Sequence, residues 1–261
     1  QGGMLMDKNQ LLHLATNIYE EALMANSYWE IINQYHSNIS NYNEEMNYSP
    51  AFYHVIYQAL VEGVFINLAK IYDAHGNALT IGTLLEEMKK ISVDDFHESV
   101  VKHYKLRGNR FQHRLKQDEE CFFKKEVSEQ HSTCDVLKID YIHTTVELTF
   151  DEIIDLYVKK LSSIKPSIEN LRIQRNKIYA HNDRQTNFDF KSIYEKNPIN
   201  KKDADVLIDL ALDISCLCVE ILTGVSKARS YTNIDDWEAS LKMIQIGEQY
   251  QDAYLKELIT D

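Results

Sequence analysis

The chain has 261 residues, 44% of them hydrophobic and 26% charged, with a formal net charge of −12. This size and composition are those of a globular protein of one or two domains and exclude a fibrous or disordered chain. The negative charge excludes a general nucleic-acid coat, because phosphate binding needs a basic surface, but it is compatible with a small basic site. With only three prolines and eight glycines, the chain favours long helices over a strand-rich fold.

Four cysteines, at positions 121, 134, 216 and 218, form no convincing disulfide framework for a chain of this size. We find no signal peptide, and no apolar run reaches about 18 residues, so we expect a cytoplasmic protein without a membrane span. Residues 1–6 begin with "QGGM", which we interpret as a tag scar and a disordered start.

The first long helix is predicted over residues 7–42, where Leu11, Leu14 and Ile18 recur at helical spacing. Ser49 and Pro50 then predict a helix start, a cap followed by a first-turn proline. The helix after them is apolar on more than one face, so we expect it to be the central, most buried helix of a bundle. Gly63 inside it allows a close helix crossing, and Gly76 is the expected stop.

The middle of the chain is more polar. "TIGTLLEEMKK" fits a short helix, and residues 94–130 predict a further helix that is interrupted near Gly108. The irregular segment that follows, to about residue 148, reads as a long connection with one short extended piece. We therefore predict a charged insertion over about residues 94–147.

The second half returns to long helices. Thr149 and Glu152 form a capping-box pattern, and Pro166 predicts a kink or a break in the helix that follows. A long apolar helix is predicted over 203–228, ending in basic residues as the helix dipole prefers, and an amphipathic helix over 233–259. The predicted fold is all-α, an up-and-down bundle of four to five long helices with additional short helices. Residues 7–228 form its domain, and the C-terminal helix in 229–261 packs on the same domain.

The helix near residue 175 carries an unusual arginine. Ile164, Ile168, Leu171 and Ile178 recur as the buried stripe of a helix, and Arg175 falls near the middle of that stripe. Arginine is rarely buried unless it is paired or has a function. The stretch 172–191 is also locally basic, in contrast to the acidic chain as a whole.

A histidine follows six residues later, just before the helix-breaking "ND". On an ideal helix, positions six apart differ by about 120° in direction and about 9 Å in height, so Arg175 and His181 would not share a face. They converge if His181 lies in a fraying last turn, or if a second helix or subunit completes the site. A histidine at a helix C-terminus is also favoured in its protonated form.

This pair suits metal-free RNA cleavage, in which the 2′-hydroxyl attacks the adjacent phosphate. His181 fits proton transfer, Arg175 fits stabilisation of the extra negative charge on phosphorus, and Asn176 fits orientation of the phosphate or the histidine. We also expect Lys177, Arg172 and Tyr179 to contact the substrate.

The stretch "RNKIYAHND" resembles the signature of the HEPN superfamily, small all-helical domains with an arginine, a polar residue and a histidine. Upstream, "NLAKIYDAHGNALTIGTLLEEM" is similar to the AbiU-like branch, which is linked to abortive phage infection. The resemblance implies a metal-independent endoribonuclease that needs no cofactor, with Arg175, Asn176 and His181 at a homodimer cleft. It further implies RNA as substrate, a role as a toxin, and an antitoxin or defence partner. Some relatives carry a modified tyrosine two places after the histidine, where this chain has Asp183.

Other interpretations remain open. Asp73 either pairs with Arg175 or is a solvent-exposed helix end. Cys121, His131, Cys134 and His143 have spacings that match no common zinc site, and the Glu-x-x-His repeat of a di-iron bundle is absent. The main rival function is a non-catalytic module for nucleotide, RNA or protein binding, in which Arg175 stabilises the structure.

Overall fold

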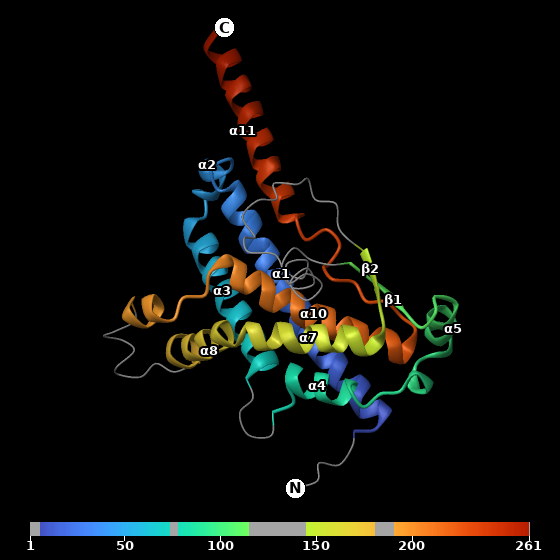
Figure 1. Ribbon diagram of the computed structural model, residues 1–261. Helices are drawn as coiled ribbons and strands as arrows, with labels where there is room; N and C mark the ends of the chain where they lie inside the picture. The colour runs from blue at the N-terminus through green and yellow to red at the C-terminus, as the bar shows by residue number, and fades with distance from the viewer. Residues whose placement is uncertain (1–5, 74–77, 115–144, 181–190, 261) are drawn as a thin grey trace, which may run out of the picture.

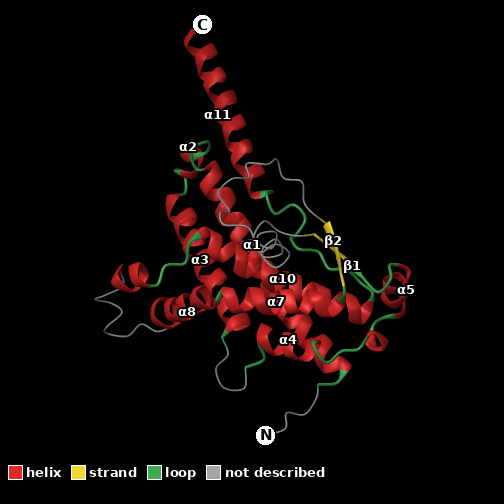
Figure 2. Ribbon diagram, in the orientation of Figure 1, coloured by secondary structure: helices red, strands yellow, loops and turns green. Residues whose placement is uncertain are grey.

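The computed structural model describes residues 6–73, 78–114, 145–180 and 191–260. Within this part the fold is all-α with one small antiparallel sheet, as predicted (Figures 1 and 2). The first group of elements is α1 (Lys8–Asn38), α2 (Asn43–Met46), α3 (Pro50–Tyr72), α4 (Ile81–Met88), the 3₁₀ turn η1 (Val93–Asp95), α5 (Glu98–Leu106) and β1 (Phe111–Arg114). The second group is β2 (Thr145–Leu148), α7 (Phe150–Ser163), α8 (Lys165–Gln174), the π-helical turn η2 (Arg175–Ala180), α10 (Lys201–Thr223) and α11 (Trp237–Thr260).

The core lies between α1, α3 and α10, with α1 contacting each of the other two along much of its length and α4 and α7 closing the core (Figure 1). The helix α1 begins at a capping box, in which the side chain of Asp7 accepts from the backbone N–H of Gln10 and the side chain of Gln10 accepts in return. The crossing of α1 and α3 depends on Gly63. A Cβ on Gly63 would lie 2.6 Å from Cε2 of Tyr28 on α1, so the predicted close crossing is confirmed.

The prediction that α3 is the most buried helix is wrong. Its second half, from Val64 to Tyr72, is in the core, but its first half exposes Phe52 (60%), Val55 (62%) and Ile56 (41%). The most deeply buried long helix of the described chain is α10. Apolar residues on several faces of α3 therefore indicate two different environments, a core around one half and an exposed apolar surface on the other.

The predicted interruption near Gly108 is confirmed, and the prediction that the helix resumes after it is wrong over residues 109–114. Gly108 and the following Asn109 both have positive φ, 64° and 63°, which turns the chain out of α5. The chain then enters β1, which pairs antiparallel with β2 in the register Phe111↔Leu148. The short extended piece predicted before Thr149 is thus confirmed as β2, and residues 115–144 of the predicted insertion lie outside the described residues.

The capping box at Thr149 and Glu152 is confirmed at the start of α7. The chain breaks at Ile164, which ends α7 and precedes α8, and Pro166 lies in the first turn of α8. This break redirects α8 toward the end of α3, so that α8 and η2 both contact α3.

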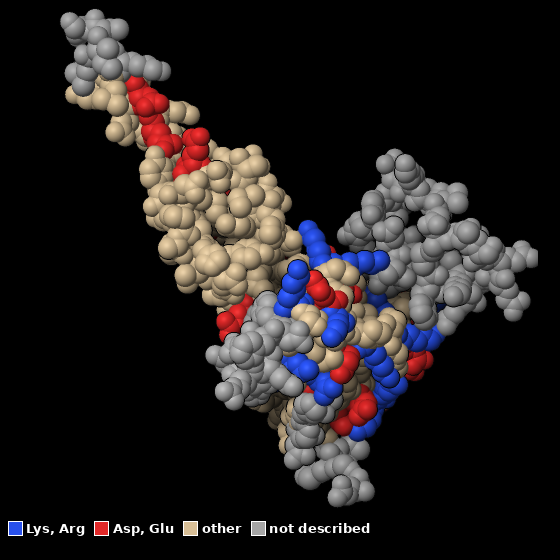
Figure 3. Space-filling view, turned by 90° about the vertical axis from the view of Figure 1, so that its left-hand side faces the viewer, with Lys and Arg blue, Asp and Glu red and all other residues tan. Residues whose placement is uncertain are grey.

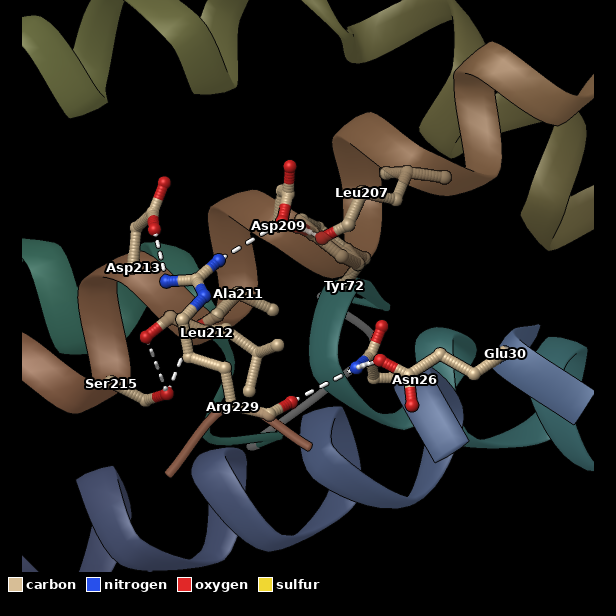
Figure 4. Close-up of polar contacts among 10 residues, drawn as sticks. All are labelled: Asn26, Glu30, Tyr72, Leu207, Asp209, Ala211, Leu212, Asp213, Ser215 and Arg229. Atoms are coloured by element: carbon tan, nitrogen blue, oxygen red, sulfur yellow. Dashed lines mark hydrogen bonds and ion pairs between the residues drawn. The ribbon is translucent and has the colours of Figure 1, made fainter. Parts of the chain in front are cut away.

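The helix α10 ends at Thr223 and does not reach Ala228 as predicted. Gly224, with φ of 73°, forms a left-handed C-cap that stops it. The following strap is bound to both α10 and α1 (Figure 4): Arg229 donates to Asp209 (2.9 Å) and Asp213 on α10, and its backbone oxygen accepts from Asn26 on α1 (2.9 Å).

The helix α11 packs on the bundle through its first three turns. Leu241 enters a small second core with Tyr42 and Met46, and the indole N–H of Trp237 donates to Gln34 (2.7 Å). The last hydrogen bond to the bundle joins Tyr48 to Glu248. Beyond this contact the helix projects away from the bundle (Figure 1).

Candidate functional site

The arginine motif begins where the regular α-helix ends. Arg175 is the first residue of the π-helical turn η2, which directly continues α8. Short π-helical turns within helices occur frequently at functional sites because their wider spacing redirects side chains. The turn is a feature that the apolar periodicity of the sequence does not reveal.

Arg175 forms an ion pair with Asp73, the residue that follows the last turn of α3. The side chain of Asp73 is 9% exposed and that of Arg175 is 27% exposed, so the pair is largely shielded but open on one side. Of the two alternatives left open for Asp73, the structure shows the pairing with Arg175. It joins two segments that lie 102 residues apart in sequence.

The pairing leaves donor capacity on the guanidinium. One terminal nitrogen, Nη2, donates to Asp73, while Nε is buried and has no hydrogen-bond partner in the described chain. A guanidinium has five N–H donors in a planar fork suited to two oxygens of one phosphate. Asp73 therefore orients Arg175 without using all of its donors.

Gln174 is a residue that the sequence analysis missed. Its side chain is fully buried, and its amide nitrogen donates to the backbone oxygen of Asn197. Asn170 donates to the backbone oxygen of Pro198 in the same segment (3.0 Å), and Ser167 donates to Asp203 in the first turn of α10 (2.7 Å). A glutamine next to the arginine was a weak signal, because polar residues on a helix are usually exposed.

These bonds bring a set of basic side chains around the motif. Figure 3 shows Lys and Arg gathered on this face of the molecule, over α8 and the segments beside it. Exposed lysines of these segments are Lys159, Lys165, Lys177, Lys191, Lys196, Lys201 and Lys202. The described acidic residues between positions 159 and 202 are Glu169 and Glu195. An acidic chain thus has a locally basic surface, which we call the basic face.

The predicted site residues have different positions. Asn176 is half-buried beside Arg175, and Lys177 is exposed. Arg172 is bound through two nitrogens to Glu169 on its own helix (3.0 and 2.6 Å). His181 and the side chain of Tyr179 lie outside the described part of the structure, so the predicted convergence of Arg175 and His181 stays a prediction.

A cleft of about 480 Å³ lies between α1 and the end of α3, lined by residues that include His13, Glu21, Lys70 and Leu79. Arg175 and Asn176 are not among its lining residues. Within the described ranges, no three His, Cys, Asp or Glu side chains come together as metal ligands would. The unmatched zinc spacing at Cys121, His131, Cys134 and His143 lies outside the described residues.

One helix of the described chain, α3, is long and apolar enough to cross a membrane by length and composition. Its second half lies in the core, and Asp73 at its end holds Arg175. A core helix of a globular protein passes the same test, so this finding carries little weight on its own.

The comparison with known families decides the classification. A HEPN family model described as AbiU2 matches residues 8–239. The chain belongs to the AbiU2 family of HEPN domains. No curated protein and no solved structure gives a significant match.

The AbiU2 match spans both stretches that resembled this branch, the one ending α3 and the one at Arg175. In the structure these two stretches meet in the Asp73–Arg175 ion pair. The family and the all-α fold inferred from the two motifs are confirmed, and this AbiU2 chain is an abortive-infection HEPN domain.

Proposed function

We propose that the chain is a metal-independent endoribonuclease that acts in phage defence as a growth-arresting toxin. The observation that carries the proposal is the position of Arg175, which Asp73 orients while its side chain stays 27% exposed, beside the basic face of an otherwise acidic protein. Such a surface attracts a phosphate backbone locally, and Arg175 supplies a fixed charge at one phosphate.

In the proposed reaction, the 2′-hydroxyl of the RNA attacks the adjacent phosphorus and loses its proton to a base. The bond from phosphorus to the 5′-oxygen of the next nucleotide breaks, and that oxygen takes up a proton. The products are a 2′,3′-cyclic phosphate and a free 5′-hydroxyl. His181 transfers the protons, Arg175 stabilises the negative charge that builds up on the phosphate, and Asn176 orients the phosphate or His181.

The proposal includes a homodimer in which two motifs share one cleft, a cytoplasmic location, and an antitoxin or defence partner that restrains the activity. Lys177, Arg172 and Tyr179 are the proposed substrate contacts. Arg172 is already bound to Glu169, so it can contact RNA only if the phosphate shares its nitrogens with Glu169 or displaces Glu169. Lys177 is therefore the stronger candidate.

The test is cleavage of bulk transfer RNA and total cellular RNA in excess EDTA. We expect wild type to cut and to leave 2′,3′-cyclic phosphate ends, while Arg175→Ala and His181→Ala lose at least 100-fold in rate. His13→Ala, which removes an exposed histidine on α1, is the matched control and should keep full activity. Equal cutting by all variants, or loss of cutting in EDTA, would rule out this mechanism.

A second candidate is the non-catalytic module, and the Asp73–Arg175 pair itself favours it, because an ion pair between two helices stabilises a fold without any chemistry. In that case Arg175→Ala lowers thermal stability and no RNA is cut by wild type under any condition. Cleavage of RNA by wild type separates the two candidates, because both expect a lower melting temperature when the ion pair is removed.

A further inference from the structure

A group of aromatic rings lies where the end of α1 meets the first half of α3. The ring of Tyr57 on α3 contacts that of Tyr35 on α1 (5.3 Å between centroids) and that of His36 (5.4 Å, edge to face). The hydroxyl of Tyr57 and Nε2 of His36 share a hydrogen bond of 2.9 Å. His36 is exposed and Tyr57 is half-buried, so these contacts hold both rings at the surface in fixed orientations.

A fourth ring comes from a distant part of the chain. Tyr194 lies in the short helix 191–196 of the basic face, and its side chain is exposed. Burial raises the pKa of the Tyr57 phenol, and the phenols of Tyr194 and Tyr35 raise it further, so Tyr194 lies near Tyr57. We call Tyr35, His36, Tyr57 and Tyr194 the aromatic cluster.

The helix that carries Tyr194 is bound to the arginine motif. The backbone oxygen of Asn197, one turn after Tyr194, accepts from the buried amide of Gln174, which directly precedes Arg175. The backbone and side-chain N–H groups of Asn197 both donate to the oxygen of Ile193, which closes the short helix (3.1 and 2.9 Å). Tyr194 therefore has a defined position relative to Arg175 on the same surface.

Cations flank Tyr194. Lys191 lies three residues before it, on the same side of the helix, and Lys196 lies two residues after it, both exposed. Glu195 pairs with Lys191 at 3.8 Å, and an exposed pair of this kind is weak, so it leaves Lys191 available to a phosphate. An exposed ring among cations is typical of sites for single-stranded nucleic acid, in which rings stack bases and cations contact phosphates.

We propose that the aromatic cluster is a binding site for unpaired nucleobases, so that the RNA is single-stranded where it crosses the basic face. This inference rests on the proposed action on RNA and names the form of RNA that is bound. One base stacks on the exposed ring of Tyr194, the rings of His36 and Tyr57 extend the stacking surface, and the adjoining phosphates contact the lysines and Arg175. In a duplex each base face is covered by its neighbour, so a duplex offers Tyr194 no ring to stack on.

A protein partner fits this surface less well. Lysine is depleted in the cores of protein interfaces, because its ammonium group is strongly hydrated. Lys191 and Lys196 are exposed on either side of Tyr194, and Lys201 and Lys202 follow in the first turn of α10. They belong to the face on which Figure 3 shows Lys and Arg gathered. RNA phosphates neutralise such charges, whereas a protein interface would have to bury them.

The test measures binding without cleavage, by fluorescence anisotropy. The probe is a 2′-O-methyl oligonucleotide of alternating cytidine and adenosine, about 20 nucleotides long, which has no free 2′-hydroxyl and exceeds the span of one stacking site. The same strand annealed to its 2′-O-methyl complement is the duplex probe. We expect wild type to bind the single strand at least about 10-fold more tightly than the duplex. Tyr194→Ala should weaken single-strand binding at least about 5-fold, the loss expected for one stacked base, and should change duplex binding less than about 2-fold.

The controls separate stacking from structure and from charge. Tyr194→Phe keeps a ring and should bind the single strand within about 2-fold of wild type. Tyr250→Ala removes another exposed tyrosine, one that has Glu248 and Asp252 two places away, and should leave binding unchanged. Because stacking releases no counterions, Tyr194→Ala should lower the affinity at every salt concentration without changing the salt slope.

Several results would overturn the base site. They are a wild type that binds neither probe, a duplex bound as tightly as the single strand, Tyr194→Phe as damaging as Tyr194→Ala, or equal losses for both probes in Tyr194→Ala. A changed oligomeric state of Tyr194→Ala in sedimentation velocity, at unchanged RNA affinity, would assign the ring to a protein contact instead.

The base site and the ribonuclease activity fail separately. A wild type that binds the single strand through Tyr194 but cuts no RNA would leave the base site standing and remove the proposed activity. A wild type that cuts RNA, with Tyr194→Ala binding as tightly as wild type, would remove the base site and leave the activity.

Discussion

At the scale of single residues, the Asp73–Arg175 pair joins the end of α3 to the start of η2. Asp73→Asn keeps the shape of the side chain but removes its charge, so we expect the free energy of unfolding to fall by about 1–2 kcal/mol, between the values for exposed and buried pairs. Urea unfolding of Asp73→Asn, Arg175→Met and the double variant gives the coupling between the two residues. Additive effects, with no coupling, would show that the pair contributes nothing to stability.

Cys216 and Cys218, the two cysteines that the structure describes, have higher thiol pKa values than an ordinary cysteine. Burial raises the pKa of Cys216 to about 11 and that of Cys218 to about 12. Both therefore stay protonated near neutral pH, where a thiol with an ordinary pKa of about 8.5 is already partly ionised. In a Cys121→Ser, Cys134→Ser background, we expect iodoacetamide to react far more slowly at pH 7.5 than with a free cysteine peptide.

The same shifts predict the sign of a pH dependence. Because the folded pKa values are raised, the stability that these thiols contribute is fully present below the unfolded pKa of about 8.5 and is lost as pH rises toward 11. Unfolding measured from pH 8 to pH 11 should therefore show falling stability, and the fall should be smaller in Cys216→Ala. Rapid alkylation at pH 7.5 would contradict the buried position of the thiols.

At the scale of elements, the crossing of α1 and α3 depends on Gly63. In Gly63→Ala, the new Cβ would lie 2.6 Å from Cε2 of Tyr28, so the ring or the helix must move. Overpacking costs about 1–3 kcal/mol and exceeds the helix-propensity gain of about 1 kcal/mol, so we expect a lower melting temperature. Gly82→Ala on α4 is the control, because its Cβ would meet Oγ1 of Thr80 at an ordinary 3.6 Å and stability should hold or rise.

Element ends were predictable where one residue type fixes the backbone. Pro50 starts α3, Thr149 and Glu152 cap α7, and the chain breaks two residues before Pro166. The end of α10 was missed because the apolar pattern runs past Gly224, whose left-handed conformation stops the helix. Only one short extended piece was predicted, the one that forms β2. The strand β1 was missed because strand pairing depends on a partner more than thirty residues away in the sequence.

At the scale of the whole molecule, the net charge of −12 and the basic face act in opposite directions on RNA. If about five lysines contact phosphates, the logarithm of RNA affinity should fall with the logarithm of salt concentration with a slope of about −3 to −4. Lys201→Glu combined with Lys202→Glu should weaken binding at least 10-fold and reduce that slope. Lys89→Glu at the C-cap of α4, remote in sequence from the basic face, should change affinity much less. A salt-independent affinity would count against a phosphate-binding surface.

The sequence by itself determined the helical class, the family and the candidate arginine, because periodicity, caps and short motifs are local properties of the chain. It also predicted Asp73 as a partner of Arg175, as one of two alternatives. Only the tertiary structure decided between them, since whether two side chains 102 residues apart meet depends on how helices pack. The same holds for α3: its composition shows how apolar it is, but only the packing of α1, α10 and α11 decides which half enters the core and which half stays exposed.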